Sequence, residues 1–278
     1  MPHEEEGFKL SVKSIDIKEL LQAGAHFGHS SSRWHPKMAP YIHSVRDGNH
    51  IIDLTKTVVA LEQALAFLEK TAGEGKQILL VSTKRQARDK VREIAEALGM
   101  PYVTERWLGG MLTNQATIGA RIKYLVDLEN KMAGGELEAR YSKLEVQRFA
   151  EEIEAMNKLY GGIKNLQARP GAVFVVDMLS DNIAVREARK LEIPVVGLAD
   201  TNVDPSLADY PVPCNDDATK TINLILDYVK SAIEVGKSET KAPATPEDKP
   251  AEVAQKPLAK PKTVTADRQP ITLAKETK

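Results

Sequence analysis

The stretch "QILLVSTKRQARDKVREIAEAL", residues 77–98, decides the fold class because a strand pattern passes directly into a helix pattern within it. The opening run "QILLVS" is rich in Ile, Leu and Val without alternation, as in a parallel strand that is covered on both faces. Four apolar residues then recur at helical spacing: Ala87, Val91, Ile94 and Leu98. The stretch therefore predicts a buried strand followed by an amphipathic helix.

Three other runs have the same strand character, and helical patterns lie between them. The runs are "IIDL" (51–54), "AVFVVD" (172–177) and "PVVGLA" (194–199). Apolar residues recur at helical spacing over 55–71, 182–191 and 218–235. Alternating strands and helices predict an α/β domain built on a doubly wound parallel sheet, of the flavodoxin-like kind.

Two consecutive helical patterns break this alternation. The first covers 115–132, an "AGGE" link follows, and the second begins near Ser142, where Ser142 and Glu145 match a capping box. This arrangement predicts an antiparallel helical hairpin that is inserted between strands and projects from the sheet. The expected boundaries are a flexible N-terminus (1–9), an α/β domain (10–112 and 161–236), the hairpin (113–160) and a disordered C-terminal tail (237–278) rich in Lys and Pro.

The composition limits the compartment and the partners. The chain has 278 residues and one cysteine, Cys214, which excludes an intrachain disulfide and favours a reducing compartment. It has no apolar run of membrane-spanning length and no secretory signal, so we expect a cytoplasmic protein without membrane contact. The formal net charge is -1, yet residues 76–123 hold 9 basic against 4 acidic residues. This concentration predicts nucleic-acid contact on one face, with an uneven solvated surface as the alternative.

Residues 23–54, "AGAHFGHSSSRWHPKMAPYIHSVRDGNHIIDL", combine cations with flat rings. We expect Arg33, Lys37 and Arg46 to pair with RNA phosphates and Trp34 to stack on an exposed base. A metal site is an alternative, because His26 and His29 are three residues apart and would converge on a helix. An ordinary loop, whose histidines bond to carbonyl groups, is the third interpretation.

The turn after the 77–82 run places Lys84, Arg85 and Arg88 at the start of a helix. The free amides and positive end of a helix favour an anion, so these residues are predicted to bind RNA phosphate. The Walker, Rossmann and G-x-S-x-G patterns are all missing, which removes the usual signatures of nucleotide-binding proteins and of hydrolases. Ordinary helix capping with a solvated basic face remains the alternative.

The segment "ERWLGGMLTNQ", residues 105–115, joins the predicted strand "PYV" to the hairpin. We expect Trp107 to be a buried anchor between sheet and hairpin, and Gly109 and Gly110 to let the chain reverse. Thr113 or Asn114 would then cap the next helix. Arg106 would point outward to RNA phosphate. In the alternative, Trp107 itself stacks on a base.

Several carboxylates follow the last predicted strands: Asp200, Asp204, Asp209, Asp216 and Asp217. Ligands of open α/β sheets bind at this edge, so His29, Asp200, Asp204 and Asp216 (or Asp217) form a candidate site for a divalent ion. Turn formation and helix capping are the favoured interpretation, and no cofactor is required. The functional alternative is an α/β enzyme that acts on a phosphorylated substrate through Asp200, Asp204 and Asp216.

A set of motifs occurs together in this order: "AGAHFGH", "WHPKMAPYI", "IIDLTKT", "STKRQA", "RWLGGMLTN", "GGIK", "FVVD", "IPVVGLADTN" and "NDDA". Over residues 10–236 the chain resembles the bacterial small-subunit ribosomal proteins of the S-two family. His35 and Ser82 depart from the family pattern, which usually has asparagine and glycine there.

The resemblance implies a structural, non-enzymatic protein with no small-molecule substrate. It implies binding to small-subunit ribosomal RNA at the junction of head and body, and help in recruiting ribosomal protein S-one, in support of translation. The motif match does not itself say which side chains touch RNA. A free interaction scaffold that uses the acidic hairpin is a further alternative.

Overall fold

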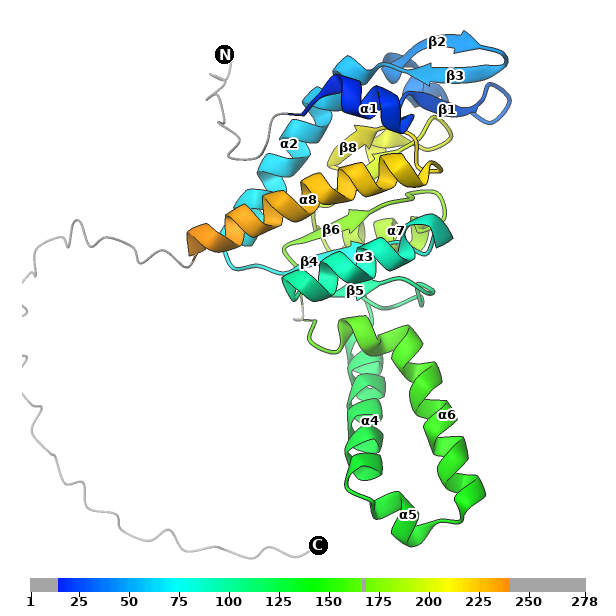
Figure 1. Cartoon of the computed structure of the whole chain (residues 1–278), viewed down its shortest axis with the longest axis vertical. Helices are drawn as coiled ribbons and strands as arrows, with labels where there is room; N and C mark the ends of the chain where they lie inside the picture. The colour runs from blue at the N-terminus through cyan, green and yellow to red at the C-terminus, as the bar shows by residue number, and fades with distance from the viewer. Residues whose placement is uncertain (1–14, 167–168, 241–278) are drawn as a thin grey trace, which may run out of the picture. The chain divides into compact units, whose positions relative to one another are not determined.

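The computed structural model describes residues 15–166 and 169–240. Five parallel strands form its central sheet in the order β5-β4-β6-β7-β8 (Figure 1). They are β4 (Ile78–Val81), β5 (Tyr102–Val103), β6 (Ala172–Val175), β7 (Val195–Ala199) and β8 (Tyr210–Pro213). Every residue of β4, β6 and β7 is buried, because helices cover both faces, and this confirms the doubly wound α/β class.

Alternate residues of the strands enter two separate cores. Leu80 and Phe174 pack with the helices on one face: α2 (Leu54–Gly73), α3 (Arg85–Leu98) and α8 (Thr219–Thr240). Leu79 and Val173 face the other way and pack with Trp107 and with α7 (Asn182–Lys190). The period of two along each strand thus divides apolar side chains between the faces, and both layers of helices are held by burial.

The two edges of the sheet are closed by different means. At β5, the backbone of Gly162 lies against Tyr102 so closely that a Cβ atom there would be 2.2 Å from the Tyr102 carbonyl oxygen. At β8, Pro211 and Pro213 have no N–H to offer to another strand. Edge-to-edge pairing with a further chain is therefore disfavoured.

The prediction that "IIDL" belongs to the parallel sheet is wrong. Its isoleucines lie in β3 (Asn49–Ile52), the middle strand of a separate antiparallel sheet with β1 (Phe27–Ser30) and β2 (Ile42–Arg46). Asp47 and Gly48 join β2 to β3 with positive φ angles of 50° and 77°. Asp-Gly is a strong hairpin signal, and here it outweighs the resemblance of the run to a buried parallel strand.

The inserted hairpin consists of α4 (Gln115–Ala133), a short α5 (Glu136–Arg140) and α6 (Lys143–Tyr160). Asn114 caps α4, and Ser142 and Glu145 form the capping box expected for α6. Glu129 on α4 accepts hydrogen bonds from Asn157 on α6 and from Lys164, which ties the two arms together. The arms extend away from the β5 end of the sheet (Figure 1).

The chain ends differ in part from the expected boundaries. The first described helix is α1 (Ile17–Ala23), capped by Asp16, and it packs against α2 and α8. At the other end α8 continues to Thr240, so residues 237–240 are helical and do not belong to the tail. Residues 1–9 and the remaining tail, 241–278, lie outside the described residues. Within the described part, none of the helices combines the length and the apolar character needed to cross a membrane.

Candidate nucleic-acid interface

The carboxyl ends of the parallel strands bring together most of the residues predicted to function. Lys84 follows β4, Arg106 follows β5, and the carboxylates follow β6, β7 and β8. Two hollows along this edge share Ser180. One, of about 570 Å³, is lined by Arg33 and Lys84, and the other, of about 320 Å³, by Arg88 and Arg106. Arg33, Lys84, Arg88 and Arg106 therefore line one edge of the molecule.

Lys84 does not point toward solvent, and the prediction that it binds phosphate needs correction. Its Nζ lies 2.8 Å from Asp216 Oδ1, 2.6 Å from Asp217 Oδ1 and 3.4 Å from Asp177 Oδ2. Burial opposes its charged form, but the hydrogen bonds to Asp216 and Asp217 outweigh this and raise the pKa of Lys84. The ammonium group is thus a permanent counter-charge for the carboxylates at the ends of β6 and β8.

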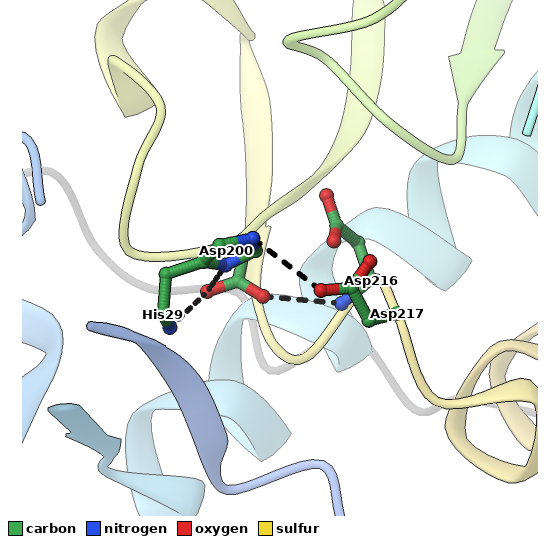
Figure 2. A group of neighbouring side chains, drawn as sticks. All are labelled: His29, Asp200, Asp216 and Asp217. Atoms are coloured by element: carbon green, nitrogen blue, oxygen red, sulfur yellow. Dashed lines mark hydrogen bonds and ion pairs between the residues drawn. The ribbon is translucent and has the colours of Figure 1, made fainter. Parts of the chain in front are cut away.

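His29 enters the same group of carboxylates from β1 (Figure 2). Its Nδ1 lies 3.1 Å from Asp200 Oδ1 and its Nε2 lies 3.3 Å from Asp217 Oδ2. The hydrogen bond with Asp200 raises the pKa of His29. Burial, together with the nearby Asp177 and Asp200, raises the pKa of Asp216 to about 7. His29 and Asp216 therefore hold their protons more tightly in this cluster than the free side chains do.

The geometry changes the predicted metal-ligand set. His29, Asp200, Asp216 and Asp217 each offer one ligand atom, and these atoms lie within 4.8 Å of one another. Asp204 is not in this group: it accepts from Lys37 Nζ at 2.7 Å and caps the turn Pro205–Leu207. His26 is not in this group either: it precedes β1, and because His29 lies in a strand the helical spacing that would bring the two rings together is absent. An imidazole with three carboxylates suits a divalent ion chemically, although Lys84 already occupies one side.

Five other predicted RNA contacts fall into two groups. Arg33, Arg85 and Arg106 are exposed, and no ion pair holds any of them among residues 15–166 and 169–240. Arg88 is held by Glu105 at 3.0 Å and by the Thr83 carbonyl group, and Lys37 is held by Asp204. The first group is free to bind phosphate, whereas each cation of the second group must first release its carboxylate partner.

Trp34 and Arg46 lie outside the edge formed by the parallel strands. Trp34 is 39% exposed and packs against the His50 ring, with centroids 5.2 Å apart, beside the antiparallel sheet. Arg46 ends β2 at the exposed turn to β3, 3.9 Å from Asp47. Both side chains remain accessible, so their contact with RNA stays a prediction.

Trp107 lies in the core between the sheet and the start of α4. It is 6% exposed and packs with Leu79, Val81 and Ile118. Its Nε1 donates to Glu187 on α7 at 3.2 Å. A ring buried in this way is not available to stack on a base.

The two glycines of "RWLGG" are not equivalent. Gly110 has a φ of +94°, and an added Cβ would lie 3.1 Å from Asn114 Cβ, so this position requires glycine. Gly109 has neither a positive φ nor a neighbour within 4 Å of an added Cβ. The reversal of the chain therefore depends on Gly110.

The departures from the family motifs fit the local structure. His35 caps the turn Pro36–Tyr41 by accepting from the Lys37 amide at 3.3 Å, which is the role that an asparagine side chain plays at a helix start. Ser82 is fully buried and its backbone has a negative φ, so glycine is not needed there. Its hydroxyl group has no hydrogen-bond partner in the described part of the chain.

Glu187 is the important side chain that the sequence interpretation missed. A glutamate on an amphipathic helix is normally exposed, but this one is 8% exposed and accepts five hydrogen bonds from residues 107–113. One signal was present: Glu187 lies one position before Ala188 and two after Val185, on the apolar face of α7. A charge at such a position indicates a buried partner.

Comparison with known proteins agrees with this architecture over most of the chain. The family model of ribosomal protein S2 matches residues 20–236. This chain belongs to the ribosomal protein S2 family. The small ribosomal subunit protein uS2 of Thermus thermophilus is 53% identical over 212 residues, which are 76% of this chain and 82% of that protein. The uS2 protein of Roseiflexus sp. (strain RS-1) is 47% identical over 224 residues, 81% of this chain and 85% of that protein.

Membership of the S2 family settles the class of function. The chain is a structural protein of the small ribosomal subunit, associated there with ribosomal RNA and other subunit proteins, and it is not an enzyme. The alternative of an enzyme using Asp200, Asp204 and Asp216 is therefore wrong. The structure agrees, since Asp204 lies apart from the other two and Lys84 neutralises Asp216.

Proposed function

We propose that this S2-family chain binds small-subunit ribosomal RNA through the edge formed by the carboxyl ends of its parallel strands. The observation that carries the proposal is a set of exposed guanidinium groups without a carboxylate partner in the described chain. Arg33 and Arg106 line the two hollows of this edge, and Arg85 begins α3 directly after β4. Guanidinium groups pair with phosphate oxygens through two parallel hydrogen bonds. Lys84 and Arg88 support this edge by neutralising carboxylates that would repel phosphate.

The position in the subunit is part of the same proposal. We infer that the chain lies at the junction of head and body, in the cytoplasm, and supports translation by helping to recruit ribosomal protein S-one. Recruitment requires a surface for protein as well as one for RNA. Ile17, Leu21 and Phe27 offer it, because they are 44%, 52% and 53% exposed on or beside α1. Ile17 and Leu21 lie one turn apart on α1, and neighbouring exposed apolar side chains favour protein contact.

A filter-binding titration with small-subunit ribosomal RNA tests the RNA proposal. Affinity should fall steeply as salt rises, since each phosphate contact releases counterions, with a slope of about -0.7 to -0.9 per contact. Removing Arg33, Arg85 or Arg106 by substitution with alanine should reduce the slope by about one contact each. Lys70→Ala is the control, because Lys70 lines a hollow at the opposite ends of the strands. An equal loss of RNA affinity in all four variants, or an affinity that does not change with salt concentration, would refute the assignment.

We also propose that His29, Asp200, Asp216 and Asp217 hold a divalent ion. The convergence of four ligand atoms supports this, and zinc is the ion that an imidazole with carboxylates suits best. The ion would join β1 to the ends of β7 and β8. Elemental analysis of the purified full chain should find zinc in stoichiometric amount, and His29→Ala should abolish it. A metal content no higher than that of the buffer removes the proposal.

A further inference from the structure

The loop that begins the inserted hairpin, residues 107–113, is built around one carboxylate. Glu187 Oε1 accepts from Trp107 Nε1 at 3.2 Å and from the Gly110 amide at 2.6 Å. Glu187 Oε2 accepts from the Leu112 amide, the Thr113 amide and the Thr113 hydroxyl group, each at 3.1 Å. The loop therefore wraps its donors around an anion, in the manner of a backbone nest.

The carboxylate comes from a rigid and distant part of the chain. It belongs to α7, which connects β6 to β7, whereas the loop connects β5 to α4. Ala184, Val185 and Ala188 of α7 are fully buried against the sheet, so the helix that carries Glu187 is fixed by packing. Burial opposes ionisation, but the amides of the loop outweigh it and lower the pKa of Glu187. The carboxylate consequently remains an acceptor at neutral pH.

We propose that Glu187 is the positioning residue of the hairpin: it holds the loop 107–113 in the one shape that sets the direction of α4 and the place of Arg106. Thr113 is two residues before α4 begins, and Arg106 directly precedes Trp107. Five hydrogen bonds on one anion leave the loop little freedom. Trp107, Met111 and Leu112 anchor the loop in the core, and backbone hydrogen bonds from Met111 to Leu108 and from Asn114 to Gly110 close its turns. The bonds to Glu187 add the link that ties the loop's amides to α7.

Glu187→Gln in the full chain tests this role, because it keeps the shape and turns one acceptor into a donor that faces the donors of the loop. Amide exchange at Gly110, Leu112 and Thr113 should accelerate by about tenfold or more, because hydrogen bonds to a charged acceptor are stronger than those between neutral groups. Exchange in β6 should change far less. Glu192→Gln is the matched control, because Glu192 is exposed and follows the same helix.

The direction of the hairpin gives a second readout that general destabilisation does not mimic. Spin labels at Ala97→Cys on α3 and Ala139→Cys on α5 report the distance between sheet and hairpin, and Cys214 is buried and will not react. The distance distribution should be narrow in the parent and broad or displaced with Glu187→Gln. Unchanged distances and unchanged exchange would overturn the proposal.

A milder substitution guards against loss of folding. Thr113→Val removes one of the five donors, and it should shift exchange and distances in the same direction by a smaller amount. Both variants should also bind RNA more weakly, because Arg106 would be displaced. Of the three readouts, only RNA affinity rests on the proposed contact of Arg106. If exchange and distances change while RNA affinity does not, the positioning role stands and the RNA contact of Arg106 fails.

Discussion

At the scale of the residue, Trp107 and Trp34 have opposite surroundings and should respond differently to removal. Trp107 is buried between the sheet and α4, and Trp34 is 39% exposed. Trp107→Ala should lower the free energy of unfolding by about 3–5 kcal/mol, because it leaves a cavity in the core. Trp34→Ala should cost about 1 kcal/mol or less and is the control. Urea denaturation followed by circular dichroism measures both, and equal effects would contradict the burial of Trp107.

In the chain freed of metal by a chelator, His29 should make stability depend on pH in a defined direction. Its pKa in the folded chain is raised above the ordinary 6.5, so folding favours the protonated ring. This stabilisation is complete below pH 6.5 and is lost as pH rises through the higher, folded value. His29→Gln should remove that loss, which thermal melts from pH 5.5 to 8.5 will show. The exposed His43→Gln serves as the control and should leave the profile as it is.

Single residues show where sequence reasoning stops. The burial of Trp107 could be predicted, because a large apolar ring beside a glycine pair, at a junction between elements, usually packs in the core. The partners of Lys84 and Glu187 could not. Their carboxylates and amides come from segments 74 to 133 positions away, as the separations of Thr113 from Glu187 and of Lys84 from Asp217 show. Only the folded sheet edge brings these groups together.

At the scale of the element, the connection from β5 to α4 depends on one of two adjacent glycines. Gly110 has a φ of +94° and little room for a Cβ, whereas Gly109 has open space. Gly110→Ala should therefore cost about 1–3 kcal/mol of stability and Gly109→Ala less than about 0.5 kcal/mol. Denaturant titrations of this matched pair decide the point. A larger loss with Gly109→Ala would show that the reversal lies elsewhere.

A helix or strand could be predicted where the residues that specify it lie within the element itself or at its ends. The strands β4, β6 and β7, the helix α3 and both arms of the hairpin follow from apolar period and caps. The edge strand β8 was not predicted, because its two prolines suggest a turn, although an edge strand tolerates them. The antiparallel sheet was missed although Asp47-Gly48 signals a hairpin, because β1 and β2 are short and largely exposed and so show no apolar strand pattern.

At the scale of the whole molecule, a weakly acidic chain presents cations on one edge because a buried lysine neutralises the carboxylates that lie at the same edge. Lys84 joins the ends of β4, β6 and β8 through Asp177, Asp216 and Asp217. Arg85, the next residue, remains exposed. The fold thus separates two adjacent cations, one directed into the protein and one outward.

Lys84→Met should reveal this separation, because it leaves the carboxylates buried without a counter-charge. Breaking such a pair costs about 3–5 kcal/mol, so the free energy of unfolding should fall by that order at pH 8. This loss of unfolding free energy should become smaller as pH falls, because protonation of Asp216 removes negative charge. The pKa of Asp216 is about 7 with Lys84 in place. Without Lys84 the pKa should be higher, so the stability should begin to recover at a higher pH. Arg85→Ala should instead leave the free energy of unfolding within about 0.5 kcal/mol of the parent value and lower the RNA affinity. Denaturation at several pH values, beside filter binding of the folded variants, separates the two cations. If Lys84→Met melts like the parent yet binds RNA more weakly, the lysine faces the RNA and the division of roles at this edge is refuted.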